Sequence, residues 1–329
     1  MTGGLRIDSW LVLSSRLHRW EILAAAAGVA ILSAAMLWFA WQLRTLAATD
    51  PGCVDPAAYA PGCSQLGQRF YELGSKAEWL SYLSWLAPFA MGLVLGVPLV
   101  SREVEHRTAG LAWTMSRSRT GWLAGRAAFL ILVMFVLLIV VAVVGETLAS
   151  ATMPAQHLDR DFAWYGRRGA LIVVRGLASL GIGVLIGAWL GRVLPALLVA
   201  VFASVLVFSA ISVGMDRWIE GDAILQKFDA DRAGGRQLAE RILLPSGELI
   251  DYGELQRRGL AYEVIQDDLL WAKPEDIGHM DRLIGYDRYL VVPGSRYPQI
   301  VLRESAAVGG AAVLFALAII LVVKRRRVG

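Results

Sequence analysis

The chain alternates between long apolar segments and shorter charged ones. A helix needs about 20 apolar residues to cross a hydrocarbon core of ~30 Å. Six segments are long and apolar enough: 22–46, 79–100, 127–149, 169–190, 193–214 and 305–323. Hydrophobic residues make up 56% of the 329 positions, which is more than soluble domains of this length carry. The pattern predicts an α-helical polytopic membrane protein with six transmembrane helices.

Basic residues concentrate in alternate connecting segments. One set contains Arg6, Arg16, Arg19, Arg102, Arg107, Arg117, Arg119, Arg126, Arg192 and residues 324–327; the other short segments contain Arg44, Arg69, Lys76, Arg160, Arg167 and Arg168. Lys and Arg accumulate on the cytoplasmic side of membrane proteins. Both termini are therefore predicted to be cytoplasmic, in a multi-pass protein of a bacterial plasma membrane. The same asymmetry accounts for the net charge of +4 without a nucleic-acid partner.

Residues 1–21 have the spacing of a helix that lies on a membrane surface. Trp10, Leu13, Leu17 and Trp20 recur at intervals of three and four, while basic residues occupy other faces. We expect a cytoplasmic interfacial helix here. The alternative is that the segment is only the charged flank of the first span.

The only two cysteines, Cys53 and Cys63, lie in the loop between the first two predicted spans. Two cysteines in one short loop on the oxidising side favour a disulfide bond. Free thiols and a metal pair are the alternatives, and no histidine lies close enough in sequence to support a metal site.

Residues 215–304 form a charged segment between the fifth and sixth spans. We predict a small extracellular α+β domain, because long loops cross the membrane regardless of their charge. Within it, residues 242–252 have the pattern of a hairpin with its turn at 246–247, 254–260 and 262–270 have helical patterns, and 289–292 have that of a strand.

The fourth predicted span carries a stripe of small residues. Ser179, Gly183, Gly187 and Gly191 follow one another at intervals of four, which places them on one helix face. Small residues let a neighbouring helix approach closely in lipid, so we expect a packing surface. A groove along which helices slide during transport is the alternative.

The most informative charges inside predicted spans are those of Glu146 and Arg175. Glu146 lies near the outer end of the third span and Arg175 near that of the fourth. A charge buried in lipid costs at least ~2.5 kcal/mol, so a partner or a wet cavity is expected. We predict that the two residues pair or line an outer gate. The alternative is that each side chain reaches the interface independently.

Residues 101–119 form the most distinctive polar segment. It is charged at its start, amphipathic in its middle and basic at its end, which is typical of a short surface helix that presents a polar face to a soluble partner. Glu103 and Glu105 point in different directions if the segment is helical. We therefore expect one of them to face the partner and the other to pair with Arg102 or Arg107.

Several parts of this region resemble one protein family. Residues 92–98, the Arg102-Glu103-x-Glu105 cluster, Thr108, residues 111–114 and Arg119-x-x-Trp122 resemble the second cytoplasmic signature of type-2 ABC exporter permeases, most closely the actinobacterial branch. Residues 17–21, which resemble the entry of that family's elbow helix, and 293–304 resemble further segments of it. One departure is Arg107, where the family usually has glycine.

The resemblance implies the transmembrane subunit of an ATP-driven exporter. In that family residues equivalent to 101–119 form a coupling helix that sits in a groove of a separate ATPase. The resemblance assigns this role to Arg102, Glu103, Glu105, Thr108, Trp113 and Arg117. It further implies two ATPase subunits, which bind the ATP and magnesium, and a second permease in a homodimer or heterodimer. The substrate, which crosses between the permeases, is expected to be hydrophobic or amphipathic.

The chain itself has no phosphate-binding loop of the Gly-x4-Gly-Lys-Ser/Thr type, so we predict that it is not an enzyme and holds no cofactor. The expected domain organisation is 1–21 (interfacial helix), 22–214 (five spans and the coupling helix), 215–304 (extracellular domain) and 305–329 (last span and basic tail). The rival hypothesis is a non-transporting sensor or scaffold, whose outer domain binds a ligand or envelope partner and signals to an ATPase.

Overall fold

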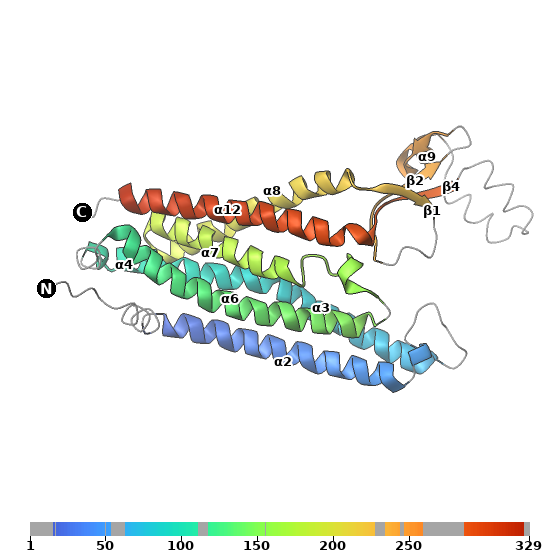
Figure 1. Ribbon diagram of the computed structural model, residues 1–329, viewed down its shortest axis with the longest axis horizontal. Coiled ribbons are helices and arrows are strands. Elements are labelled where there is room, and N and C mark those ends of the chain that lie inside the picture. Colours follow the sequence, from blue (N-terminus) through green and yellow to red (C-terminus); the bar gives the residue numbers. More distant parts are fainter. Residues whose placement is uncertain are drawn as a thin grey trace, which may run out of the picture. The chain divides into compact units, whose positions relative to one another are not determined.

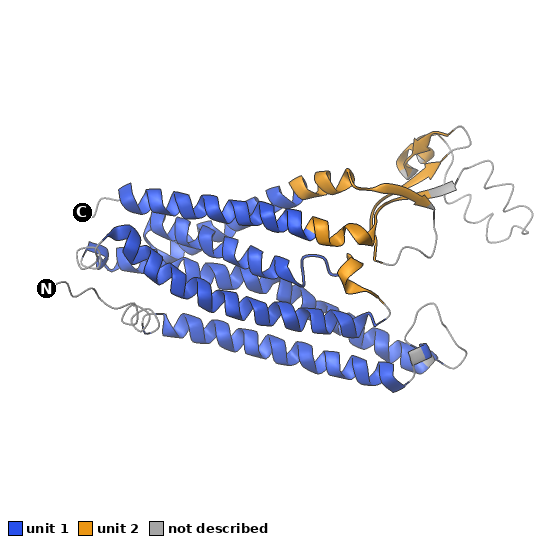
Figure 2. Cartoon of the chain, in the orientation of Figure 1, with its two compact units in different colours: residues 1–155, 164–213, 301–329 blue, residues 156–163, 214–300 orange. Residues whose placement is uncertain are grey.

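The computed structural model describes residues 16, 18–49, 51–53, 63–110, 118–154, 156–227, 234–243, 247–258 and 286–325. The chain divides into two compact units, which Figure 2 distinguishes by colour. Unit 1 comprises residues 1–155, 164–213 and 301–329, and unit 2 comprises 156–163 and 214–300. The main helices are α2 (Arg19–Thr49), α3 (Ser64–Gly96), α4 (Pro98–Glu105), α6 (Arg119–Thr152), α7 (Ala170–Leu190), α8 (Val193–Glu220) and α12 (Tyr297–Arg325).

Within the described residues, six helical stretches are long and apolar enough to cross a membrane, as the sequence predicted. They correspond to α2, α3 with α4, α6, α7, α8 and α12. Three of these helices begin well before their apolar segments do, α3 at Ser64, α6 at Arg119 and α12 at Tyr297. The thickness of the bilayer limits only the apolar part of a helix, so polar residues extend it at either end. As a result Arg126 and Glu304 lie inside helices and not in the flanking segments where they were predicted.

Helices α3 and α7 approach each other closely, and their small residues make this possible. A Cβ atom added to Gly92 would lie 2.6 Å from the Cβ of Ser179, and one added to Gly96 would lie 2.6 Å from the backbone oxygen of Leu180. On the α7 side, a Cβ at Gly183 would lie 3.1 Å from the backbone nitrogen of Val97. The stripe predicted on the fourth span is therefore a packing surface.

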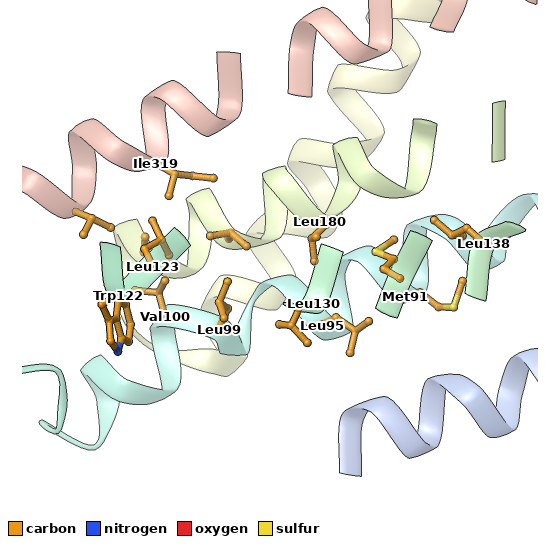
Figure 3. Packing of buried hydrophobic residues seen from close by; sticks show 14 of the residues in the cluster. Met91, Leu95, Leu99, Val100, Trp122, Leu123, Leu130, Leu138, Leu180 and Ile319 are labelled. Atoms are coloured by element: carbon orange, nitrogen blue, oxygen red, sulfur yellow. The ribbon is translucent and has the colours of Figure 1, made fainter. Parts of the chain in front are cut away.

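The largest buried cluster of unit 1 lies where α3, α4, α6 and α7 meet. Figure 3 shows Leu95 and Leu99 packed among side chains of α6 and α7, with Ile319 of α12 at the edge of the same cluster. Leu95, Leu99 and Leu130 are almost completely buried. Figure 1 shows α2, α3, α6 and α7 running along one common direction. This packing fixes the position of α4, which continues directly from α3.

The break between α3 and α4 is local. Val97 keeps a helical conformation, with φ −58° and ψ −49°, and its backbone N–H donates to the Leu93 carbonyl. Pro98 follows as the first residue of α4 and has no N–H to donate. The eight residues of α4 end at Glu105, and Arg107 then adopts a left-handed φ of 57°.

Unit 2 contains a four-stranded antiparallel sheet with the strand order β1-β4-β2-β3. The strands are β1 (Ile224–Lys227), β2 (Arg236–Leu243), β3 (Leu249–Ile250) and β4 (Tyr286–Val292). The short helix α9 (Tyr252–Arg257) follows β3 in the chain and contacts β2. The predicted hairpin is confirmed by the pairing of Ile242 with Ile250, and the strand predicted at 289–292 is part of β4. The helix expected at 254–260 is shorter and begins earlier.

Some predicted features fall on residues outside the described part of the chain. The interfacial helix predicted for 1–21 is covered only at Arg16 and from His18 onward, and α2 begins at Arg19. The helix predicted at 262–270 and the turn residue Ser246 also lie outside the described residues.

Candidate functional site

The acidic residues of the predicted coupling segment make contacts inside the chain. Glu103 of α4 accepts a 2.6 Å hydrogen bond from Nη1 of Arg126 through one carboxylate oxygen and a 2.9 Å bond from Oγ1 of Thr108 through the other. The Arg126 side chain is 5% exposed and that of Glu103 is 15% exposed. This buried ion pair ties α4 to the second turn of α6.

Glu105 and Arg102 connect the same helix to two other elements. Oε2 of Glu105 accepts a 2.9 Å bond from the backbone N–H of Val193, the first residue of α8, and so satisfies a donor that the start of that helix leaves without an intrahelical partner. Nη1 of Arg102 lies 2.9 Å from Oε1 of Glu21 on α2. The expectation that one of the two glutamates pairs with Arg102 or Arg107 is wrong, because helices distant in sequence supply the partners.

A tight turn follows α4. The backbone N–H of Arg107 donates to the Val104 carbonyl at 3.1 Å, and that of Thr108 donates to the Glu103 carbonyl at 3.0 Å. The left-handed φ of Arg107 explains why a glycine would suit this position, since glycine adopts such φ values without steric cost. His106, Arg107 and Thr108 are exposed. They form a polar surface at the tip of a segment that α2, α6 and α8 hold in place.

Trp113 and Arg117, which the resemblance also assigns to the coupling helix, lie outside the described residues. Arg102 and Glu105 are exposed despite their contacts. With Glu105, the exposed residues 106–108 form a continuous accessible surface of four side chains at 105–108.

A buried histidine, His18, lies near the Glu103–Arg126 pair, although the sequence favoured a surface position for it. His18 is 3% exposed at the start of α2. Burial lowers its pKa below the ordinary value, and the positive charges of Arg126 and Arg102 add to this effect, while Glu21 and Glu103 oppose it. The Arg126 guanidinium also lies 4.7 Å from the ring centroid of Trp122. An arginine directly before the long apolar segment 127–149 was the signal that could have revealed this cluster.

Glu146 and Arg175 do not pair with each other. Glu146 of α6 contacts Arg168, whose Nη1 lies 3.0 Å from Oε2. Arg175 of α7 pairs with Glu304 of α12, with Nε 3.0 Å from Oε1 and Nη2 also in contact with that oxygen. The proposed Glu146–Arg175 pair is therefore wrong, because each residue has its own partner.

The Arg175–Glu304 pair is largely buried and has further polar contacts. The side chains are 14% and 6% exposed. The Tyr165 hydroxyl donates to Oε2 of Glu304, and Nη1 of Arg175 donates to the Gly166 carbonyl at 2.9 Å. The cluster joins α7, α12 and the segment before α7. Glu304 was missed as a partner because the sequence placed it just outside the last span.

Cys53 and Cys63 are joined by a disulfide bond with an S–S distance of 2.01 Å. Among the described residues no group of three or more His, Cys, Asp or Glu side chains is arranged to hold a metal ion.

Comparison with known proteins identifies one family. The model of the family described as "ABC-2 membrane transporter related" matches residues 25–218, which is more than half of the chain and includes α4 and its contacts with α6 and α8. No curated protein and no solved structure matches the chain. The match begins inside α2 and ends inside α8, so it covers five of the six candidate spans and leaves α12 outside. The chain thus belongs to the ABC-2 membrane transporter related family of multi-pass membrane proteins.

Proposed function

We propose that this chain is the transmembrane permease subunit of an ATP-driven exporter, and that the surface at 105–108 docks onto a separate ATPase subunit. The observation that carries the proposal is the family match over residues 25–218, which contains the complete α4 segment. A permease of this kind needs an ATPase to drive it, and two copies acting on two permeases would complete the assembly. ATP and magnesium would bind to the ATPase.

The contacts of α4 support a role in transmitting force. Its three charged side chains reach α2, α6 and α8 through Glu21, Arg126 and the Val193 amide. Because α4 also continues from α3, a displacement at its exposed tip moves the ends of four long helices together. A short helix without such contacts would unwind or tilt instead of transmitting the movement.

The orientation that follows places α4, both termini and the ATPase in the cytoplasm, and unit 2 and the Cys53–Cys63 loop outside. Single cysteines introduced into a C53S/C63S background test this orientation in intact cells. A membrane-impermeant maleimide should label Arg69→Cys, at the disulfide end of α3, and should leave His106→Cys unlabelled until the cells are broken. Labelling of His106→Cys in intact cells would show that the chain has the opposite orientation in the membrane.

Co-purification tests the ATPase partner. The full chain is isolated from its native cells in mild detergent, and the proteins bound to it are identified by mass spectrometry. We expect an ABC-type ATPase with the unmodified chain and its loss with His106→Ala combined with Arg107→Glu. Both side chains are exposed, so the variant should fold normally.

Arg69→Glu is the matched control, because Arg69 is exposed on α3 at the opposite end of that helix from α4. It should retain the ATPase. If the unmodified chain binds no ATPase under conditions that preserve other membrane complexes, the exporter proposal fails. If an ATPase binds but the reconstituted complex moves no substrate, the non-transporting sensor becomes the better hypothesis.

A further inference from the structure

An apolar cavity of about 670 Å³ lies within unit 1, lined by α4, α6, α7 and α12. Small residues from three helices contribute to the lining, among them Ala124 and Ala127 of α6, Gly181 of α7, and Ala312 and Ala316 of α12. Small side chains leave the space between these helices open. Its volume is in the range of natural small-molecule sites, roughly 300–1,000 Å³.

The lining is polar only at one end. Ser118 and Thr120, at the start of α6, supply its two hydroxyl groups, and every other lining residue is apolar. Along α12 the lining begins at Ile320, close to the end of the predicted span 305–323, and reaches Ala312, about 16 Å from that end at 1.5 Å per helical residue. The hydrocarbon depth of one leaflet is about 15 Å, half of the bilayer core. The cavity therefore extends through one leaflet, with its hydroxyl groups at the membrane surface.

Positive charge flanks the polar end. Arg119 lies between the two hydroxyl residues in the chain. Lys324 is exposed and follows the lining residue Ile320 by four positions, so it lies one turn further along the same face of α12. A ligand with an anionic group at this end and an apolar chain in the cavity would match both features.

A transmembrane helix with its side chains is about 10–12 Å wide. An acyl chain is much narrower, so it can fill the cavity without separating the helices that line it.

We infer that this cavity binds the acyl chain of an anionic membrane lipid, which enters from the leaflet at the Ser118 end, and that such amphipaths are the substrate class of the transporter. The substrate part rests on the proposed function. Binding itself involves only this chain and is tested without the ATPase.

The probe is phosphatidylglycerol with a photoactivatable diazirine in its acyl chain, mixed into phosphatidylcholine nanodiscs that hold the full chain. After irradiation, labelled peptides are located by mass spectrometry. We expect labelling to concentrate on residues 119–131 of α6 and 312–320 of α12, and phosphatidylglycerol without the diazirine should compete for it.

Ala127→Phe combined with Ala316→Phe should reduce this labelling about tenfold or more, since the two added rings displace acyl methylene groups and the loss of only two buried methylenes removes about that much affinity. Ala128→Phe is the matched control: Ala128 is exposed on α6 but does not line the cavity, so labelling should persist. Lys324→Gln should reduce the preference for phosphatidylglycerol over a phosphatidylcholine probe.

Labelling spread evenly over the lipid-facing residues of α2 and α8, and unchanged by Ala127→Phe with Ala316→Phe, would overturn the inference. If the cavity is labelled but phosphatidylglycerol does not raise the ATPase rate of the complete complex, the site is not the substrate site and that part of the inference is refuted. Absence of an ATPase from the complex would instead refute the proposed function and leave the labelling result intact.

Discussion

The Glu103–Arg126 pair allows a sharp test of how the coupling segment is held. Replacing Glu103 by Gln keeps the shape of the side chain and removes its charge. Arg126, whose side chain is 5% exposed, then loses the carboxylate that lies 2.6 Å away. Breaking a buried ion pair by removing one partner costs about 3–5 kcal/mol.

Two contacts reduce this cost. Arg126 also lies over the ring of Trp122, at 4.7 Å from its centroid, and the amide oxygen of Gln can still accept a hydrogen bond. We therefore expect Glu103→Gln to lower the free energy of unfolding by about 2–3 kcal/mol. In a chain of this size that corresponds to a fall in Tm of about 5 °C.

The assay is thermal unfolding in mild detergent, followed by intrinsic fluorescence, on the two single variants Glu103→Gln and Arg126→Met and on the double variant. If the side chains interact, removing both charges should recover much of the loss, with a coupling energy of about 1–3 kcal/mol. Glu105→Gln is the control, because its exposed carboxylate accepts from the Val193 N–H and should cost less than about 1 kcal/mol.

Binding of the ATPase gives a second result from the same variants. If Glu103 acts by holding α4 against α6, the double variant should bind the ATPase better than Glu103→Gln alone. Additive effects of the two changes on Tm would refute the ion pair. Recovery of stability without recovery of binding would show that the Glu103 carboxylate itself contacts the partner.

Three further predictions concern backbone packing, a strained turn and pH. Gly96→Ala should destabilise the chain by about 1–3 kcal/mol in the same unfolding assay, because the added methyl would lie 2.6 Å from the Leu180 carbonyl oxygen. Gly28→Ala is the control: no atom lies within 4 Å of the added methyl, so this change should be neutral or slightly stabilising. Equal effects of the two changes would refute the close approach of α3 and α7. Arg107→Gly should raise stability by about 0.5–1 kcal/mol by relieving the left-handed φ of 57°, and a loss of stability would contradict this. Burial lowers the pKa of His18, so the folded chain binds fewer protons than the unfolded chain just below the ordinary histidine pKa. The free energy of unfolding should therefore fall on acidification through about pH 6.5, by no more than about 1.4 kcal/mol per pH unit. His18→Gln should remove that part of the pH dependence.

The sequence determined the elements that depend on local composition. The apolar segments predicted all six candidate spans, because only a long apolar helix satisfies its backbone within a bilayer. The stripe of small residues predicted that a helix packs closely on α7, and the short turn containing Gly247 predicted the hairpin of β2 and β3. Each of these features depends on residues close together in the chain.

The sequence did not identify the partners of the buried charges. Arg126 lies 23 residues from Glu103, and Glu304 lies 129 residues from Arg175. Finding these pairs requires knowing which helices are neighbours and which face each one turns inward. In a soluble protein the polar face of a helix reveals its orientation.

In lipid that signal is weak, because most faces of a transmembrane helix are apolar whether they contact protein or acyl chains. Backbone packing at Gly92 and Gly96 and the contact of Gly181 with Phe315 set how α3, α7 and α12 lie against one another. The tertiary structure alone therefore decided that Arg175 contacts Glu304 and not Glu146, since helix orientation in lipid follows from contacts between helices and not from the apolar pattern of each one.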